Sequence, residues 1–190
     1  MKQQLGRERY VSRAALKLAS VAEALKLDFR GKIVLDVGSS TGGFTDYALR
    51  HGARKVIAVE AGTNQLHPSL HNNLQIELHE KTDIRDFTTD EPIDIVVADV
   101  SFVSLRQVLP AITRLCLEQT QIVVMAKPQF EAEHSSLKHK GVIKNDKIRR
   151  QILKDFEAWA RSFFVILGKA DSSVSGSQGN QERFYLLRIV

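Results

Sequence analysis

The sequence contains a single cysteine and no long hydrophobic run. One cysteine excludes an internal disulfide and any zinc cluster built from several cysteines. The longest uninterrupted apolar runs, residues 122–126 and 163–167, have the length of a strand, whereas a membrane-spanning helix needs roughly 20 apolar residues. The first ten residues are polar and lack the apolar stretch of a secretory signal. These absences predict a cytoplasmic protein with no membrane-spanning segment.

Residue types that often bind metals or act as nucleophiles occur without the usual companions. His67 and His71 are four residues apart, yet no cysteine or acidic residue lies close to them in the sequence. We therefore expect a pair on the surface of a helix and no bound metal. Cys116 is expected on the apolar face of a helix, which favours a place in the core over a role as a nucleophile.

The composition is that of one folded domain with an excess of positive charge. Of the 190 residues, 43% are hydrophobic and 26% are charged, which argues against a disordered chain. The length fits one domain, residues 1–190, in which residues 1–13 form a basic N-terminal segment. Lysine and arginine together number 27 against 22 acidic residues, and the resulting net charge of +5 favours an anionic partner.

Short apolar segments alternate with segments of helical spacing over the first 126 residues. The expected strands are residues 33–37, 55–60, 74–78, 93–98 and 121–126. The expected helices are residues 12–26, residues 44–51 and a helix whose apolar face holds Leu105, Val108, Leu109, Ile112, Leu115 and Cys116. Such alternation predicts an α/β fold with a parallel sheet covered on both faces. A polar loop over 128–145, a helix over 146–161 and strand-like segments at 163–169 and 184–190 follow.

A glycine-rich turn follows the first expected strand, directly after Asp36 and Val37. Its residues are Gly38, Ser39, Ser40, Thr41, Gly42 and Gly43. The spacing differs from the G-x-G-x-x-G pattern that binds the pyrophosphate of a dinucleotide. A carboxylate at Asp36 would repel a pyrophosphate and attract an amino or sulfonium cation, and S-adenosylmethionine carries both. The turn and Asp36 are therefore predicted to bind this cofactor.

Two further acids follow the next strands. Glu60 ends the second strand, where its oxygens would accept hydrogen bonds from ribose hydroxyls, and Asp83 would accept one from the adenine amino group. Taken singly, Asp36 and Asp83 also fit loop caps, and Glu60 fits a surface charge. The order of the three acids at successive strand ends favours a cofactor crevice.

Asp99 and Lys127 directly follow the fourth and fifth strands, so both are expected at the edge of the sheet that carries the glycine turn. Lys17 lies at the border of the apolar face of the first helix, and Glu182 comes just before the last strand. Each of these residues also has a simple structural explanation, as a solvated lysine or as the cap of a turn.

Five segments, residues 10–18 (YVSRAALKL), 35–46 (LDVGSSTGGFTD), 98–106 (ADVSFVSLR), 127–131 (KPQFE) and 140–143 (KGVI), resemble one family. It is the TlyA, or hemolysin A-like, family within the wider FtsJ-like group of RNA ribose methyltransferases, and the resemblance covers residues 10–190. It implies a Rossmann-like class I methyltransferase fold with a seven-stranded, mostly parallel sheet, an antiparallel last strand and helices on both faces. It also implies S-adenosylmethionine-dependent 2′-O-methylation of rRNA, on cytidine, with rRNA or a ribosomal subunit as partner.

The resemblance assigns the family's catalytic tetrad to Lys17, Asp99, Lys127 and Glu182, with Asp99 also beside the cofactor. Lys127 would act as the general base toward a ribose 2′-hydroxyl. Lys17 and partial burial would favour the neutral amine of Lys127, while Asp99 would orient that amine and Glu182 would hold Lys17. No metal is required, because methyl transfer needs only in-line placement.

Two features depart from the family pattern. Its members usually carry a small RNA-binding module before the YVSR segment, and this sequence begins almost at that segment, so we expect the module to be absent. The second strand ends in Glu60, where the family more often has aspartate, which keeps the acceptor and changes its reach.

Two clusters of positive charge are candidates for binding RNA phosphates. Residues 1–17 hold Lys2, Arg7, Arg9, Arg13 and Lys17, and residues 138–150 hold Lys138, Lys140, Lys144, Lys147, Arg149 and Arg150. Each cluster is also compatible with a solvated helix face.

Two other functions remain open from the sequence. A non-catalytic ribosome-binding or assembly factor would keep the fold without needing two lysines beside an aspartate. A nicotinamide-dependent oxidoreductase conflicts with the glycine spacing and with Asp36. A pore-forming protein is disfavoured by the absence of a spanning stretch and of a strongly amphipathic helix.

Overall fold

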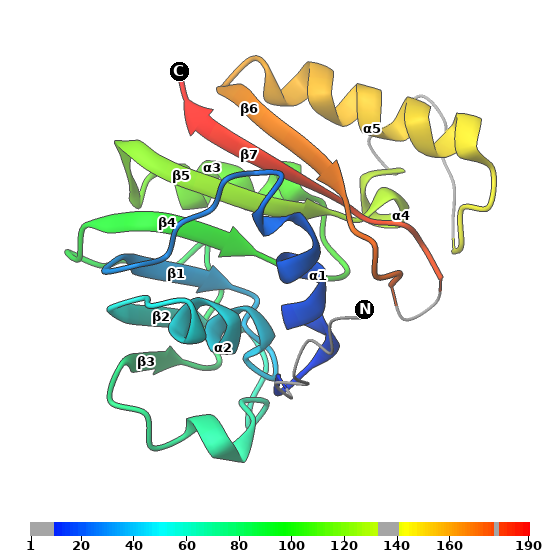
Figure 1. Ribbon diagram of the computed structural model, residues 1–190. Coiled ribbons are helices and arrows are strands. Elements are labelled where there is room, and N and C mark those ends of the chain that lie inside the picture. The colour runs from blue at the N-terminus through cyan, green and yellow to red at the C-terminus, as the bar shows by residue number, and fades with distance from the viewer. Residues whose placement is uncertain (1–9, 133–140, 177–178) are drawn as a thin grey trace, which may run out of the picture.

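Seven strands form a single sheet in the computed structural model, which describes residues 10–132, 141–176 and 179–190 (Figure 1). The strands are β1 (Ile33–Val37), β2 (Lys55–Val59), β3 (Ile76–His79), β4 (Ile93–Ala98), β5 (Cys116–Ala126), β6 (Phe164–Asp171) and β7 (Arg183–Ile189). They lie in the order β3-β2-β1-β4-β5-β7-β6. Neighbouring strands are parallel from β3 to β5, and β7 is antiparallel to both β5 and β6. The expected seven-stranded sheet with an antiparallel last strand is confirmed.

Helices cover both faces of this sheet. One face carries α1 (Arg13–Ala22) and α2 (Gly43–Arg50), which lie in front of the sheet in Figure 1. The opposite face carries α3 (Leu105–Thr113) and α5 (Asp146–Ala160). Two short elements, η1 (Pro68–Leu70) and α4 (Pro128–Glu131), complete the described structure. No helix in the described ranges is long and apolar enough to cross a membrane.

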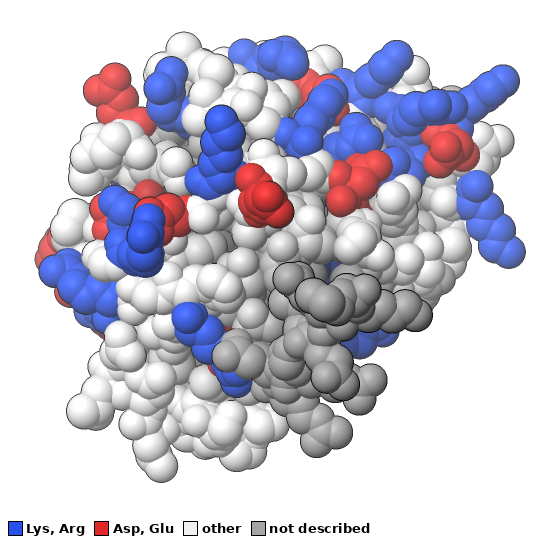
Figure 2. All heavy atoms as spheres, in the orientation of Figure 1, with Lys and Arg blue, Asp and Glu red and all other residues white. Residues whose placement is uncertain are grey.

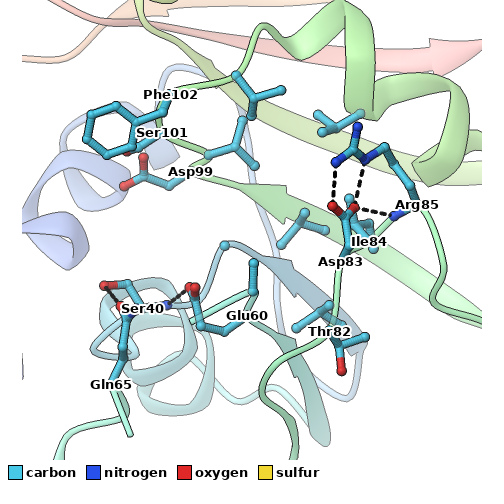
Figure 3. Close-up of a pocket in the computed structure, with 17 residues that line it drawn as sticks. Ser40, Glu60, Gln65, Thr82, Asp83, Ile84, Arg85, Asp99, Ser101 and Phe102 are labelled. Atoms are coloured by element: carbon cyan, nitrogen blue, oxygen red, sulfur yellow. Dashed lines mark hydrogen bonds and ion pairs between the residues drawn. The ribbon is translucent and has the colours of Figure 1, made fainter. Parts of the chain in front are cut away.

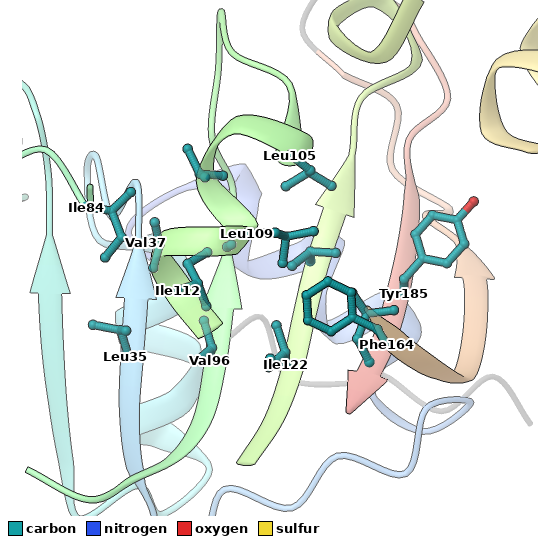
Figure 4. Packing of buried hydrophobic residues seen from close by; sticks show 14 of the residues in the cluster. Leu35, Val37, Ile84, Val96, Leu105, Leu109, Ile112, Ile122, Phe164 and Tyr185 are labelled. Atoms are coloured by element: carbon teal, nitrogen blue, oxygen red, sulfur yellow. The ribbon is translucent and has the colours of Figure 1, made fainter. Parts of the chain in front are cut away.

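The central strands β1, β2 and β4 are apolar on both sides because each side packs against a helical layer. β1 has all five residues buried, in agreement with its continuous apolar sequence. Beneath α3, Leu105, Leu109 and Ile112 pack against strand residues such as Val96 and Ile122 (Figure 4). The alternation of side chains along a strand therefore decides which of two separate cores each residue enters.

Three expectations about element boundaries are wrong. The first helix ends at Ala22, and a tight turn that closes with a left-handed residue at Lys26 (φ 53°) follows. The third helix ends at Thr113, so Cys116 begins the long strand β5 instead of lying on a helix. The segment 128–145, expected as a loop, contains α4, while residues 133–140 lie outside the described part.

Cys116 is nevertheless enclosed by apolar neighbours. Burial raises the pKa of its thiol to about 12, so the thiolate that a nucleophile needs is strongly disfavoured. The expectation that this cysteine has a packing role agrees with these surroundings.

Candidate active site

The order of the strands changes direction between β1 and β4, and ligands of open α/β sheets bind outside the carboxyl ends of the strands at such a point. The glycine turn follows β1, and Asp99 follows β4. Asp99 donates its backbone N–H to the carbonyl of Val37 at 3.0 Å, so the two strand ends are joined side by side. The fold thus places both predicted motifs at the expected crevice.

Strand alternation directs four predicted side chains to one face. Each of these side chains is two residues away from a residue that is buried in the core beneath α1 and α2. The pairs are Val34 and Asp36, Val97 and Asp99, Met125 and Lys127, and Phe184 and Glu182. Since side chains two apart on a strand share a face, all four point to the side of the sheet that α1 covers. This is the face from which Lys17 of α1 approaches.

Lys127 and Asp99 form an ion pair at the ends of neighbouring strands. The Lys127 Nζ atom lies 2.6 Å from Asp99 Oδ1, and it donates a hydrogen bond of 2.6 Å to the Ser101 hydroxyl. The side chains of Lys127 and Asp99 are only 10% and 18% exposed, so water screens this pair weakly. The lysine amine is therefore held in a defined position beside Asp99 and Ser101, which line the cavities described below.

Lys17 and Glu182 form a second ion pair on the same face. Their charged atoms, Nζ and Oε2, are 2.6 Å apart, and the side chains are 11% and 3% exposed. The pairing of Ala126 with Arg183 between β5 and β7 places Glu182 beside Lys127. All four residues of the predicted tetrad therefore meet at one edge of the sheet.

The glycine turn brings backbone close to Asp99. Gly38 has a φ of 76°, and a Cβ atom there would lie 2.7 Å from the carbonyl oxygen of Asp99. Only glycine accommodates both the left-handed backbone and this close approach. A small cavity of about 130 Å³ lies under the turn and is lined by Asp36, Ser39, Thr41, Gly43 and Asp99, among others.

Asp36 lies buried at the floor of this small cavity. Its Oδ2 atom accepts a 2.6 Å hydrogen bond from the Thr45 hydroxyl, while its Oδ1 atom has no hydrogen-bond partner among the described residues. Burial, with the nearby charges of Asp99 and Glu60, raises the pKa of Asp36 to about 7. A buried carboxylate oxygen without a donor is a site for a cationic or hydrogen-bond-donating ligand group.

A larger cavity of about 520 Å³ opens next to the small one and shares Gly38, Ser40, Asp99 and Ser101 with it. It lies between the ends of β1, β2 and β4, and Glu60, Asp83 and Asp99 approach it from different elements (Figure 3). Its volume is in the range of pockets that hold a cofactor-sized ligand.

The structure gives Glu60 and Asp83 partners that the sequence did not reveal. Glu60 accepts hydrogen bonds from the backbone N–H groups of Ser40 at 2.9 Å and Gly62 at 2.6 Å, which fixes the glycine turn to β2. Asp83 pairs with the side chain of Arg85 through contacts of 2.9 and 2.6 Å. These bonds to Arg85 hold the pKa of Asp83 below its ordinary value. Both carboxylates retain lone pairs for a ligand, with orientations already set by the protein.

The remaining glycines of the turn face neighbouring elements. Gly42 has a φ of 86° and donates its N–H to the Ser39 carbonyl at 2.7 Å, while it packs against Leu66 and Leu70. Gly42 lines neither of the two cavities. Gly43 lines the small cavity and packs against the start of α1 near Ser12 and Ala14. Both glycines were predicted to bind the cofactor. In the structure, Gly42 shapes the turn and Gly43 allows α1 to pack closely against it.

Phe102, for which the sequence predicted no role, lies at the mouth of the larger cavity (Figure 3). Its side chain is 92% exposed although apolar, and its backbone has a φ of 64°. The ring lies 5.5 Å from that of Phe130, and Lys127 Nζ lies 5.8 Å from the Phe130 ring centre. A solvent-facing aromatic with an unfavourable backbone conformation, next to the paired lysine, points to a function outside the core. The one feature of the sequence that could have identified Phe102 is its place in segment 98–106, which resembles the methyltransferase family.

Glu131 is a second residue for which the sequence predicted no role. Its only signal was its place as the last residue of the segment KPQFE. Its carboxylate is 1% exposed and accepts hydrogen bonds of 2.7 Å from both the Ser104 hydroxyl and the Leu105 N–H. It therefore fastens the loop after Asp99 to the helical turn after Lys127. This buried contact sets the relative positions of the two segments that carry the Lys127–Asp99 pair.

We expect Glu131→Ala to lower the free energy of unfolding by about 2–4 kcal/mol, because it leaves the Ser104 hydroxyl and the Leu105 N–H buried without an acceptor. Urea unfolding followed by far-ultraviolet circular dichroism measures the change. Glu118→Ala, at an exposed position of β5, is the matched control and should shift the midpoint little. Equal midpoints for the two variants would contradict the anchoring role.

Known proteins resemble the chain over nearly its whole length. The family pattern described as FtsJ-like methyltransferase matches residues 10–189. The 23S rRNA (cytidine-2′-O)-methyltransferase TlyA of Campylobacter jejuni is 43% identical over 180 residues, which cover 94% of this chain and 70% of that protein. The 16S/23S rRNA (cytidine-2′-O)-methyltransferase TlyA of Mycobacterium tuberculosis is 37% identical, over 94% of this chain and 68% of that protein. Hemolysin A of Brachyspira hyodysenteriae is 36% identical, over 96% and 77%.

Solved structures give the same picture of the fold. A protein from Streptococcus thermophilus, named provisionally as a hemolysin, superposes with a TM-score of 0.89 at 33% identity, over 100% of this chain and 70% of that one. A protein from Listeria monocytogenes, named provisionally as an S-adenosylmethionine-dependent methyltransferase, superposes with a TM-score of 0.64 at 15% identity, over 92% of this chain and 100% of that one, which supports the fold alone.

Proposed function

Since this chain belongs to the FtsJ-like methyltransferase family, we propose that it transfers a methyl group from S-adenosylmethionine to a ribose 2′-hydroxyl of rRNA. The observation that carries this proposal is the meeting of two buried lysine–carboxylate pairs beside a cavity floored by the half-satisfied carboxylate of Asp36. The names of the relatives from Campylobacter jejuni and Mycobacterium tuberculosis support cytidine as the modified nucleoside. An rRNA substrate would place the protein in the cytoplasm.

The two adjoining cavities fit the parts of S-adenosylmethionine. Asp36 Oδ1 and the Ser39 hydroxyl are buried without hydrogen-bond partners among the described residues and would face its polar amino acid end. The larger cavity would take the nucleoside, with Glu60 toward the ribose and Asp83 toward the adenine. Gly38, Ser40, Thr41, Gly43 and Asp99 would line its path, and Gly42 would keep the turn closed. When bound, the sulfonium group supplies an activated methyl group.

After its ammonium has released a proton to solvent, Lys127 would accept the proton of the 2′-hydroxyl as methyl transfer leaves S-adenosylhomocysteine. Its amine already makes a hydrogen bond to one hydroxyl, that of Ser101, so a sugar hydroxyl at that position would lie within reach. Asp99, 2.6 Å away, would stabilise the ammonium that forms on proton transfer. Glu182 would hold Lys17 at the border of the site through their ion pair. The protein thus contributes a base, its orienting partner and the alignment of substrate with cofactor.

Calorimetric titration with S-adenosylmethionine and with NAD, in parallel, tests the assignment. We expect saturable binding of S-adenosylmethionine and none of NAD. Incubation with isolated ribosomal subunits and tritiated S-adenosylmethionine, followed by ribose-methylation mapping, then identifies the modified nucleotide. Binding of NAD alone would favour an oxidoreductase. Binding of S-adenosylmethionine without transfer to either subunit would favour a non-catalytic ribosome-binding factor.

We expect Phe102→Ala to weaken the use of RNA without weakening cofactor binding. Stacking of one base on an aromatic ring contributes roughly 1–3 kcal/mol, so kcat/KM for RNA should fall about 5- to 150-fold. Phe163→Ala, which removes a 53% exposed ring just before β6, is the matched control. The stacking role is wrong if both variants methylate RNA with the parent kcat/KM.

A further inference from the structure

Positive side chains line the outer face of α5. Lys147, Arg150, Lys154 and Arg161 fall within an arc of about 60° on a helix that turns about 100° per residue. All four are exposed, as is Lys144 just before the helix, and we call these five residues the α5 stripe. In Figure 2, lysine and arginine gather over the upper part of the molecule where Figure 1 places α5.

The cations of the stripe have no ion-pair partner among the described residues, whereas Lys55, Arg85 and Lys169 on the same protein surface each have one. Like charges three or four residues apart repel one another on a helix. Lys147 also lies in the first turn, where the helix dipole disfavours a cation. Asp146 and Glu157, each four residues before an arginine of the stripe, offset part of this repulsion, and an anionic partner would neutralise the exposed charge that remains.

The stripe overlaps in part with the basic cluster predicted from the sequence at residues 138–150, since Lys144, Lys147 and Arg150 belong to both. Arg149 faces inward, where it donates to Asp171 at 2.7 Å and to the Gln181 carbonyl at 3.0 Å, and its residue exposure is 6%. It is therefore a structural residue and is unavailable to a ligand. Lys154 and Arg161, outside the predicted cluster, join the exposed row instead. Lys138 and Lys140 lie outside the described residues.

The stripe begins at the catalytic edge and runs away from it. At its first end, the Ile143 N–H donates to the side chain of Asn180 at 2.8 Å, two residues before Glu182. At the far end, Arg161 precedes β6. The helical rise of roughly 1.5 Å per residue separates Lys147 from Arg161 by about 21 Å. A chain of phosphates laid along α5 would thus reach the edge of the sheet that carries Glu182, from the face opposite to α1.

We propose that the α5 stripe is a docking surface for the phosphate backbone of RNA flanking the nucleotide that is modified. This inference rests on the proposed function, because it takes the tetrad as the place where the nucleotide reacts. The regular spacing of cations, about one per helical turn from Lys147 to Lys154, suits a repeating anion. Because phosphate contacts carry no sequence information, we expect binding that does not depend on sequence.

The test uses the full chain and a fluorescein-labelled RNA duplex of 20 base pairs with arbitrary sequence. Lys147→Gln, Arg150→Gln and Lys154→Gln are combined, because glutamine keeps helix propensity and removes charge. The control combines Lys26→Gln, Arg54→Gln and Arg188→Gln, which removes the same charge at the opposite edge of the sheet, where all three are exposed. Fluorescence anisotropy is measured between 50 and 300 mM KCl.

We expect the stripe variant to bind at least about tenfold more weakly than the control in 100 mM KCl. Its slope of log affinity against log salt should be smaller by about 2 to 3, since roughly one counterion is released per neutralised phosphate. Equal affinity and slope in the two variants, or no binding by the parent protein, overturns the inference. Displacement of the RNA by an equimolar amount of polyglutamate also overturns it, in favour of an acidic protein partner.

Calorimetry with S-adenosylmethionine separates this inference from the proposed function. The stripe variant should bind the cofactor like the parent protein, because the helix face is outside both cavities. Normal RNA binding by the stripe with no cofactor binding by the parent would refute the methyltransferase proposal alone. Normal cofactor binding with unchanged RNA binding in the variant would refute the docking surface alone.

Discussion

Replacement of Lys127 by alanine is expected to slow methyl transfer by roughly 10²–10⁴-fold, the usual contribution of a positioned general base. The structure places the lysine amine 2.6 Å from Asp99 and in hydrogen-bond contact with the Ser101 hydroxyl, at the edge of the sheet where the two cavities meet. Without the amine, the 2′-hydroxyl keeps its proton and remains a poor nucleophile. Single-turnover transfer from tritiated S-adenosylmethionine to ribosomal RNA measures the loss.

The substitution should leave cofactor affinity within a few-fold of the parent, because Lys127 lines neither cavity that would hold it. Lys81→Ala, at an exposed position with no ion pair among the described residues, controls for the loss of one lysine. The base assignment fails if Lys127→Ala transfers methyl groups at the parent rate. Slow transfer accompanied by an equal loss of cofactor affinity would instead mean that the pair with Asp99 shapes the pocket.

Asp36→Asn is expected to weaken S-adenosylmethionine binding by at least about 100-fold, because a buried charge-assisted hydrogen bond to a cationic group would be lost. The structure supports this through the unpaired Oδ1 atom and the small cavity above it. Calorimetric titration measures the affinity. Asp90→Asn, which changes an exposed carboxylate, is the control and should bind as the parent does. Parent-like affinity in Asp36→Asn would exclude this carboxylate from the cofactor site.

The same variant should be more stable than the parent above neutral pH. Burial raises the pKa of Asp36 from its ordinary value of 3.8 to about 7, so between those values the folded protein holds a proton that the unfolded chain has released. The free energy of unfolding therefore falls as pH rises through this window, and the deficit is complete above pH 7. Asparagine carries no charge and avoids this loss, which we expect to amount to roughly 1–4 kcal/mol at pH 8.

Urea unfolding at pH 5, 6, 7 and 8 tests the sign. The difference between Asp36→Asn and the parent should grow in favour of the variant as pH increases. A constant difference across these values would show that Asp36 is ionised throughout. We also expect cofactor binding at pH 6 to release a proton, because a cationic group favours the carboxylate form of Asp36. Calorimetry in buffers of different ionisation enthalpy measures that proton.

The fold could be predicted from the sequence because the central strands β1, β2 and β4 are short, mostly apolar runs between turns. Residues 33–37 and 93–98 were predicted with the observed boundaries, since apolar runs of this length between turns have few other solutions. The ends of the helices were predicted less accurately, because α1 and α3 both end earlier than the sequence indicated. Only the tertiary contacts of the following turn determine that α1 stops at Ala22 and that Cys116 enters β5.

The site was predictable to the extent that it depends on strand ends. Asp36 lies next to the carboxyl end of β1, and Asp99 and Lys127 directly follow β4 and β5. Parallel strands place their carboxyl ends at one edge of the sheet. Lys17 and Glu182 depended on family resemblance, because a helix residue and a residue before an antiparallel strand have no fixed spacing to that edge. Their ion pair is a consequence of how α1 packs across the sheet.

By itself, the sequence determined the layered α/β fold, the crevice beside the glycine turn and an excess of positive charge, because these depend on periodicity and composition along the chain. Only the tertiary structure decided which charges are free and which are occupied. Arg149 is enclosed by Asp171 while its neighbour Arg150 faces water, and Asp36 keeps one oxygen without a donor while Glu60 has donors for both. The physical reason is that burial and pairing are set by residues distant in sequence, which no local pattern specifies.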